Sequence, residues 1–157
     1  GALSVNPKVK VKVAYIGSWF DPPKAKEATL AQIEAGADLI FAERFGVFEA
    51  AKEKGILAFG NMMDQHDLAP EVVITGPVWN MGPTVRHCID EVRSKEWKAG
   101  DLREWSMMAR GGAYLAPFHE FQQKLPPEVL KEIREMEAKI MNGQFTVPII
   151  ETELKTD

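Results

Sequence analysis

The chain has 157 residues, of which 45% are hydrophobic and 27% charged, a composition typical of one folded globular domain and unlike that of disordered, collagen-like or disulfide-stabilised chains. Its net charge of −4 comes without any basic run, which argues against a nucleic acid partner. The single cysteine, Cys88, excludes a disulfide within the chain and leaves the compartment open. No apolar run reaches the roughly 18 residues of a membrane span, and residues 1–7 do not resemble a signal peptide. We therefore expect the chain either to be cytosolic or to follow a targeting segment upstream of Gly1.

The first predicted element is a strand over residues 8–17, where valines alternate with lysines before a wholly apolar stretch. Asp21 followed by Pro22 predicts the start of a helix, because the carboxylate can accept from an early helical N–H and a proline at the first helical position loses no hydrogen bond. We expect this helix to run over residues 22–35 and to end at Gly36.

Strands and helices then alternate along the chain. Apolar runs predict buried strands over residues 38–42, 56–60 and 72–75. A short helix is expected over residues 47–54, and a longer one begins at Pro83. The apolar residues of the longer helix share one face: Val85, Cys88, Ile89 and Val92. This repetition favours an α/β fold, a doubly wound, mainly parallel sheet with helices on both faces.

The pattern changes beyond Trp97. A strand or hairpin is expected over residues 105–118, followed by a helix over 127–142 and an extended tail over 145–150. Four residues are expected to form the buried side of that helix: Val129, Ile133, Met136 and Ile140. The last third of the chain therefore does not continue the repeat of strands and helices.

In an open parallel sheet, ligands bind beyond the carboxyl ends of the strands, so the residues that follow each predicted strand are candidates for a binding site. The predicted ligand-binding residues are Trp19, Phe20, Glu43, Arg44, Asn61, Met62, Asp64, Trp79 and Asn80. Phe45 and Met63 lie in the same segments after the strands. Aromatic faces beside a few amide and carboxylate groups suit a flat, partly polar small molecule.

Simpler explanations exist for some of these side chains. Trp19 and Phe20 could cover the end of the sheet, and Glu43 with Arg44 could be a solvated ion pair. Asp21 is better explained as a helix cap than as a ligand group.

Other residues that often carry chemistry lack the required pattern. Residues 64–67, Asp-Gln-His-Asp, have the composition of a metal site but not the spacing of metal ligands. Cys88 is expected to be an inert core thiol, and His87 and His119 have no evident carboxylate or nucleophile partner. The glycine-rich phosphate motifs and the Gly-x-Ser-x-Gly motif of acyl transfer are absent from the sequence. We therefore expect no catalytic residue, no bound metal and no cofactor.

Several short segments match one family, in the correct order along the chain. They are Ser-Val-Asn-Pro at 4–7, Tyr-Ile-Gly-Ser-Trp-Phe-Asp-Pro at 15–22, Gly-Ala-Asp at 36–38, Phe-Glu-Ala-Ala-Lys-Glu-Lys-Gly at 48–55 and Leu-Ala-Pro at 115–117. Through these segments the chain resembles the basic membrane protein (BMP) family, substrate-binding proteins of ABC importers that are related to purine nucleoside receptors. The resemblance extends over essentially the whole chain.

The resemblance implies one half of a two-lobed binding protein of the type I periplasmic class, whose ligand lies between the lobes. Residues 1–97 would form the C-terminal ligand-binding lobe, and residues 98–157 a returning segment that packs with this lobe or completes a missing N-terminal lobe. The implied partners are a purine base or nucleoside-like ligand, an ABC permease and the missing N-terminal lobe. The full-length protein would be extracytoplasmic, in the periplasm or as a cell-surface lipoprotein. An isolated lobe is expected to form homo-oligomers, by exchange of residues 127–142 between copies.

The resemblance also implies roles for single residues. Trp19 matches the aromatic residue that stacks on a purine. Met62 replaces an aspartate associated with the sugar in nucleoside-binding relatives, and Trp79 or Asn80 takes the place of a lysine. Residues 43–45, Glu-Arg-Phe, replace a glycine-rich stretch. These differences favour a free nucleobase or a related flat heterocycle.

Three classes of function remain open at this point. The first is a binding module that closes on its ligand by hinge motion and performs no chemistry. The second is an enzyme on a similar fold, for which Glu43 and Asp64 are the available acid or base residues. The third is a sensory or regulatory protein that detects a metabolite with the same lobe.

Overall fold

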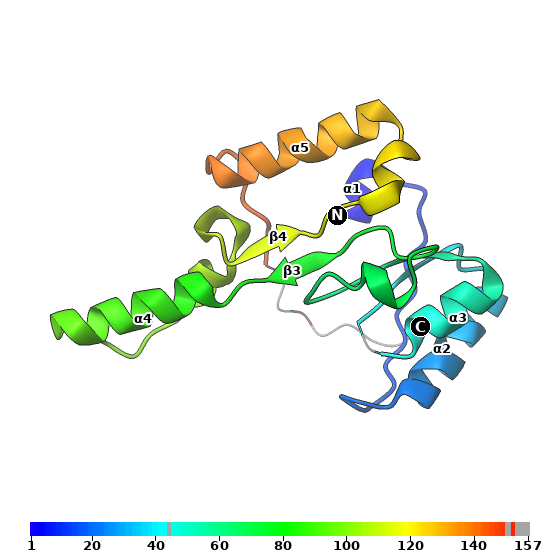
Figure 1. The fold of residues 1–157 in the computed structure, drawn as a ribbon, viewed down its shortest axis with the longest axis horizontal. Helices are drawn as coiled ribbons and strands as arrows, with labels where there is room; N and C mark the ends of the chain where they lie inside the picture. The colour runs from blue at the N-terminus through cyan, green and yellow to red at the C-terminus, as the bar shows by residue number, and fades with distance from the viewer. Residues whose placement is uncertain (44, 150–151, 153–157) are drawn as a thin grey trace.

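Helices and short strands alternate through the first half of the chain in the computed structural model, which describes residues 1–43, 45–149 and 152 (Figure 1). The α-helices are α1 Ala2–Val5, α2 Pro22–Glu34, α3 Val47–Lys54, α4 Gly82–Ser94 and α5 Pro127–Met141. The strands are β1 Leu39–Phe41, β2 Leu57–Phe59, β3 Pro77–Trp79 and β4 Ala113–Leu115. Four 3-10 turns complete the described elements: η1 His66–Leu68, η2 Arg103–Ser106, η3 Met108–Arg110 and η4 His119–Gln123.

A parallel sheet forms the centre of the first half. Strands β1 and β2 pair in parallel with Ile40 opposite Ala58. The segment 72–75 lies beside β2, because the Ala58 amide donates to Val72 O at 2.8 Å and the Ile74 amide donates to Ala58 O at 2.9 Å. The predicted strands at 38–42 and 56–60 are therefore β1 and β2, whereas residues 72–75 form only an isolated bridge, between Val73 and Ala58, and not the predicted strand. The carboxyl ends of all three segments reach one edge of the sheet.

Residues 8–17 do not form the predicted strand. Within the described residues this segment takes part in no β-ladder, and Val11 and Tyr15 are exposed to solvent. Only Ile16 packs against the core. An alternating pattern forms a stable strand when another element covers its apolar face, and the exposure of Val11 and Tyr15 shows that this face is largely uncovered among the described residues.

Helices α2 and α3 pack on the sheet and supply much of the core. Asp21 caps α2 as predicted, with its Oδ1 accepting from the Lys24 amide at 3.1 Å. Helix α3 buries Val47, Phe48, Ala50 and Ala51. The two helices approach so closely that a Cβ atom on Gly46, whose φ is +102°, would lie 2.1 Å from the Pro22 carbonyl oxygen. This contact requires glycine and fixes where α3 begins beside the start of α2.

The last third of the chain returns to the first through β4. Strand β4 pairs antiparallel with β3, with Val78 opposite Tyr114. The predicted strand within residues 105–118 is therefore present, but its partner is β3 and not a second strand of a local hairpin.

Helices α4 and α5 differ from the prediction that each would have a buried side. None of their residues, all of which the structure describes, is buried. On α4 the predicted stripe is largely exposed, with exposed fractions of 44–60% at Val85, Ile89 and Val92, and Cys88 is half-buried rather than a core thiol. On α5, Val129 and Met136 are exposed and Ile133 and Ile140 half-buried.

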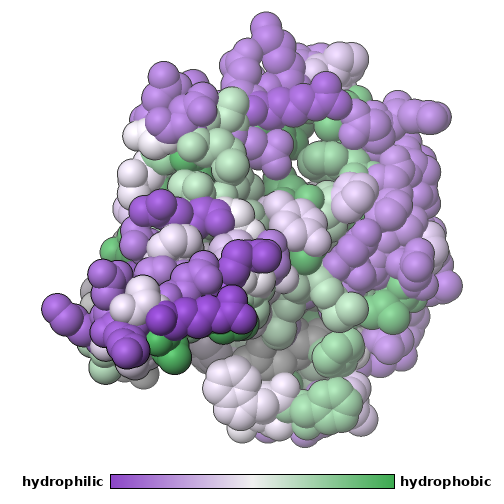
Figure 2. Space-filling view, turned by 60° about the vertical axis from the view of Figure 1, so that its left-hand side comes forward, coloured by the Kyte–Doolittle hydropathy of each residue, from purple (hydrophilic) through white to green (hydrophobic). Residues whose placement is uncertain are grey.

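The residues of α4 and α5 stay unburied because of where the two helices lie in the fold. Helix α4 projects away from the rest of the chain, and α5 lies along the opposite side of the β3–β4 pair from the parallel sheet (Figure 1). In the view that brings α4 forward, hydrophobic side chains gather in the hollowed middle of the face between hydrophilic margins (Figure 2). No helix among the described residues is both long and apolar enough to cross a membrane.

Candidate functional site

A small hollow of about 130 Å³ lies at the edge of the sheet where β1 and β2 end. It is lined by Trp19, Phe20, Ala42, Glu43, Phe45, Asn61, Met62, Met63 and Gln65. The hollow therefore joins the turn before α2 to the segments that follow β1 and β2, which is where the sheet topology predicts a ligand site.

Aromatic side chains form one side of the hollow. The Phe20 and Phe45 rings meet edge to face, with centroids 6.0 Å apart and an interplanar angle of 63°. The Trp19 side chain is 87% exposed although it is the largest apolar surface in the turn. An exposed tryptophan beside an edge-to-face phenylalanine pair offers a flat face for stacking, and its exposure means that the fold itself does not bury it.

A buried amide and a carboxylate form the polar side. Asn61 is only 6% exposed, and its Nδ2 donates to Glu43 Oε1 at 2.5 Å. The Asn61 backbone amide donates to Gln65 Oε1 at 2.8 Å, and Asn61 Oδ1 accepts from the Met62 amide at 2.9 Å. Asn61 is thus held at both its backbone and its side chain, and it orients the exposed Glu43 carboxylate at the rim.

Met62 occupies an uncommon backbone conformation at the same place. Its φ is +68°, in the left-handed region that side-chain-bearing residues rarely adopt. Its carbonyl accepts from the Trp79 amide at 2.9 Å, which attaches the loop to the end of β3. The strained backbone turns the Met62 side chain into the hollow, where it supplies an apolar surface and no charge.

Three predicted site residues lie away from the hollow. Asn80 lies two residues before α4, with its Oδ1 accepting from the Gly82 amide at 3.1 Å and its Nδ2 donating to Gly111 O at 2.9 Å. Trp79 is exposed on β3 and does not line the hollow, and Asp64 points to a histidine. The prediction that includes Arg44 falls outside the described residues.

Ala42 and Gln65 line the hollow, but the predicted site omitted both. Gln65 closes the loop by accepting from Asn61, four residues earlier. The sequence contains a signal for this contact, because a polar residue stands four positions after the asparagine that follows the strand. Ala42 gives no such signal, because a small buried residue at a strand end has many uses.

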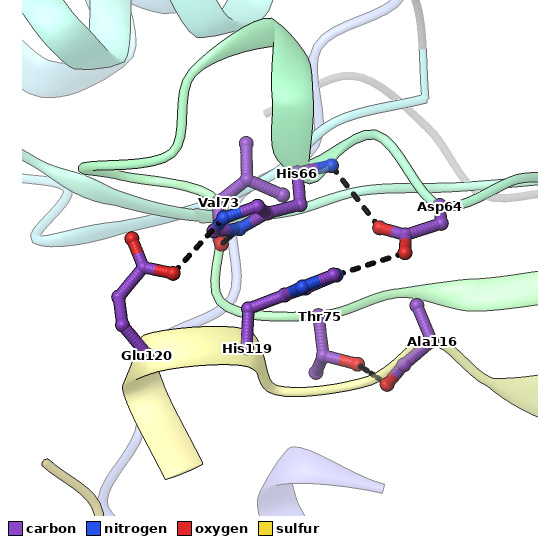
Figure 3. A network of polar contacts seen from close by, with 7 residues as sticks. All are labelled: Asp64, His66, Val73, Thr75, Ala116, His119 and Glu120. Carbon is purple, nitrogen blue, oxygen red and sulfur yellow. Dashed lines mark hydrogen bonds and ion pairs between the residues drawn. The ribbon is translucent and has the colours of Figure 1, made fainter. Parts of the chain in front are cut away.

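Asp64 belongs to a network with two stacked histidines (Figure 3). His119 Nε2 lies 2.9 Å from Asp64 Oδ2, and His66 Nε2 lies 3.0 Å from Glu120 Oε2. The two imidazole rings are nearly parallel, at 14°, with centroids 3.9 Å apart. The expectation that His119 has no carboxylate partner is therefore wrong, because its partner is 55 residues away in sequence.

His87 also has a partner that the sequence analysis missed. Its Nε2 lies 3.5 Å from Glu91 Oε1, one helical turn later on α4. Its ring stacks on Trp105, with centroids 4.1 Å apart. This pair is remote from the hollow and fastens α4 to η2.

The network shifts the ionisation of Asp64. Partial desolvation acts to raise the pKa of this carboxyl group, but hydrogen bonds from His119 and from the His66 backbone amide outweigh it. The pKa of Asp64 therefore lies below its usual value of 3.8.

The hollow has the features of a binding surface. It combines stacking area, a carboxylate that accepts hydrogen bonds and an apolar methionine side chain. Within the described ranges 1–43, 45–149 and 152, no group of three His, Cys, Asp or Glu side chains could hold a metal ion. A larger groove of about 380 Å³ runs along α5, but charged side chains such as Lys131, Arg134 and Glu135 line it and it is far from these aromatic residues in the fold.

Comparisons with known proteins show what the chain is similar to. Residues 1–151 match the family described as ABC transporter substrate-binding protein PnrA-like. The chain is 36% identical over 154 residues to a purine-binding protein of Brucella abortus, covering 95% of this chain and 42% of that protein. It is 28% identical over 149 residues to a putative ABC transporter glucose-binding protein of Haloferax volcanii, covering 94% of this chain and 37% of that protein.

A solved structure gives the same result for the fold. An ABC transporter solute-binding protein of Conexibacter woesei superposes with a TM-score of 0.66 at 19% identity, covering 94% of this chain and 49% of that one. The predicted α/β class of a single lobe is confirmed. The chain spans about half of that structure and less than half of each curated relative named above.

Proposed function

The chain belongs to the PnrA-like family of ABC-transporter substrate-binding proteins, and from this premise we propose that it binds a purine base as one lobe of a two-lobed receptor. The BMP resemblance read from the sequence is thereby confirmed at the level of the family. Substrate binding for an importer is the family's role, whereas the ligand and the second lobe are parts of the proposal.

The observation that carries the purine assignment is the exposed Trp19 indole beside the Glu43–Asn61 pair. A purine presents a flat π-face for stacking and N–H groups at its edge. A carboxylate accepts such N–H groups, and Asn61 holds Glu43 at the rim of the hollow. The 36% identity to a purine-binding protein supports the same ligand class.

Met62 supports a free base over a nucleoside. Ribose hydroxyls need hydrogen-bond partners, and a thioether is a weak acceptor without charge. A site that lacks the acceptor gains little from the sugar and must still desolvate its hydroxyl groups. We therefore propose that a base binds at least as tightly as its nucleoside.

The size of the hollow supports the two-lobed arrangement. Pockets for small ligands usually enclose about 300–1,000 Å³, and this hollow measures about 130 Å³. We propose that residues 1–97 form the ligand-binding lobe, that residues 98–157 pack with this lobe or complete a second one, and that the second lobe covers the other face of the ligand. The closed receptor would deliver the base to an ABC permease outside the cytoplasm, without performing chemistry on it.

Nuclear magnetic resonance of the Trp19 indole N–H tests the ligand class directly on this chain. Adenine and hypoxanthine at millimolar concentration should shift that signal, adenosine should shift it no more strongly, and glucose should leave it in place. Tighter binding of adenosine than adenine by more than about tenfold would overturn the preference for the base. A response to glucose alone would overturn the purine assignment.

A further inference from the structure

The stacked histidines connect the loop that lines the hollow to a distant part of the chain. We propose that Asp64, His66, His119 and Glu120, here called the histidine cluster, act as positioning residues for the site loop, defined as residues 61–65 (Figure 3). The cluster would set the position of the loop in the hollow through η4. The consequence for ligand affinity rests on the proposed function, whereas the consequence for the loop does not.

The two ion pairs of the cluster cross between the same two segments. Asp64 and His66 come from the segment after β2, and His119 and Glu120 come from η4. The first carboxylate pairs with the second histidine, and the first histidine pairs with the second carboxylate, at 2.9 and 3.0 Å. Two reciprocal pairs resist both sliding and rotation of one segment against the other, which a single pair does not.

Ring stacking and burial make the connection rigid. The His66 and His119 rings stack at 3.9 Å, and His66 is 8% exposed. His66 Nδ1 faces Val73 O at 3.4 Å while Nε2 faces Glu120. Both ring nitrogens of His66 thus have an acceptor within reach, and the nitrogen that carries the hydrogen donates to its partner. A hydrogen bond to a carboxylate is stronger than one between two neutral groups.

Residues next to these two segments along the chain are joined a short distance away. The buried Thr75 hydroxyl donates to Ala116 O at 2.6 Å, and the Ala116 amide donates to Gly76 O at 2.9 Å. These contacts hold the residue that follows β4, shortly before η4, against the end of the 72–75 segment (Figure 3). The histidine cluster therefore adds contacts that reach the site loop to those that Thr75 and Ala116 already make.

The site loop transmits the position of Asp64 to the hollow. Asp64 lies between Met63 and Gln65, both of which line the hollow. The Met63 amide donates to Asn61 O at 2.9 Å, and Gln65 accepts from the Asn61 amide. The loop is thus closed on itself, and a displacement of Asp64 must move at least one of the lining residues beside it.

Backbone strain occurs at both ends of this connection. Met62 in the site loop has a φ of +68°, and His119 in the cluster has a φ of +46°. A side-chain-bearing residue in the left-handed region is unfavourable and persists only where surrounding contacts hold it. The cluster holds His119 directly, and the closed loop holds Met62.

Hydrogen exchange on the ligand-free chain tests the positioning role. His119→Gln should speed exchange of the Asn61, Met62 and Met63 amides by about threefold to tenfold, the effect of losing one hydrogen-bonded contact. The Ala58 and Ile74 amides, which pair within the sheet, should exchange at the unchanged rate. His87→Gln is the matched control, because it removes a histidine–carboxylate pair and a ring stack outside the site.

Reversing the pair provides the second measurement. Asp64→His combined with His119→Asp restores one pair in the opposite order and should return exchange toward the original rate. Affinity for adenine should fall in His119→Gln and recover in the double variant. Unchanged exchange at residues 61–63, or equal acceleration in the sheet, would overturn the positioning role. Failure of the original chain to bind adenine would overturn the proposed function and leave the exchange result standing.

Discussion

The two halves of this chain use similar amphipathic helices in different ways. Helix α3 has eight residues and buries four of them against the sheet, whereas α4 has thirteen residues and buries none. Both helices carry an apolar face, so the difference does not lie in their sequence pattern. It lies in whether another part of the same chain covers that face.

The hollow lies at the boundary between these halves. Its polar residues come from the packed half, and the Met62 carbonyl accepts from Trp79 at the start of the open half. The packed core therefore holds the polar wall of the hollow in place. Helices α4 and α5, whose apolar faces are uncovered, belong to the other half of the chain. This arrangement is what a lobe needs if it is to hold a ligand and also meet another surface.

The largest expected effect is in the packed core. Phe48 is 5% exposed on α3, so Phe48→Ala should lower the free energy of unfolding by about 3–5 kcal/mol, as loss of a buried aromatic side chain usually does. Ile89→Ala on α4 should cost less than about 1 kcal/mol, because the side chain is already largely in solvent. Urea unfolding compares the two variants.

Phe48→Leu is the second variant, for the case in which Phe48→Ala does not fold. It keeps part of the buried volume and should cost less than Phe48→Ala while retaining the same rank against Ile89→Ala. An equal cost for the α3 and α4 substitutions would mean that the α4 stripe is covered in solution, and the contrast between the halves would break down.

The second prediction concerns Trp19. Stacking of a base on an aromatic side chain contributes about 1–3 kcal/mol, so Trp19→Ala should weaken purine binding roughly 5- to 150-fold. Because the side chain is exposed, the melting temperature should stay nearly the same. Calorimetry and thermal unfolding measure the two quantities, with Trp97→Ala as a control outside the hollow. A large loss of stability with intact affinity would make Trp19 a structural residue.

The sequence predicted the packed half well. Short apolar runs predicted the strands near 40 and 58 and the segment that bridges to Ala58 at Val73. The Asp21–Pro22 pair predicted the start of α2, because capping is local chemistry. The predictions failed where a partner was needed. The alternation at 8–17 and the stripes of α4 and α5 describe faces that would be buried if something covered them, and a pattern along one chain does not reveal what covers it.

The candidate site divides in the same way. Trp19, Phe20, Glu43, Asn61 and Met62 follow predicted strands and do line the hollow. Asp64 and Asn80 also follow strands, but their side chains turn to partners 55 and 31 residues away. Topology predicts which edge of the sheet a residue reaches, whereas its orientation depends on contacts that are distant in sequence.

The third prediction tests the uncovered stripe. Val85, Ile89 and Val92 present adjacent apolar side chains, and such surfaces promote association. We expect the chain to self-associate with concentration, and Ile89→Lys to weaken association by about tenfold, since a charge would have to be desolvated at the contact. Light scattering over a dilution series measures this. Ser94→Lys adds the same charge outside the stripe as a control, and a chain that is monomeric at every concentration would contradict the prediction.

The smallest expected effect concerns acid stability at the junction of the two halves. The folded-state pKa of Asp64 is lowered, so this carboxylate stabilises the fold at pH values above its usual 3.8, and the contribution is lost as the pH falls through the lowered pKa. The side chain is 39% exposed, which limits the effect to less than about 1 kcal/mol. Unfolding free energies between neutral and strongly acidic pH should therefore fall less steeply in Asp64→Asn than in the original chain. Adding Asp64→Asn to His119→Gln should change the slope less than Asp64→Asn does alone, because the hydrogen bond from His119 is already gone and only that from the His66 backbone amide remains. A full additional change in the double variant would show that the low pKa arises from groups other than His119, the His66 backbone amide first among them.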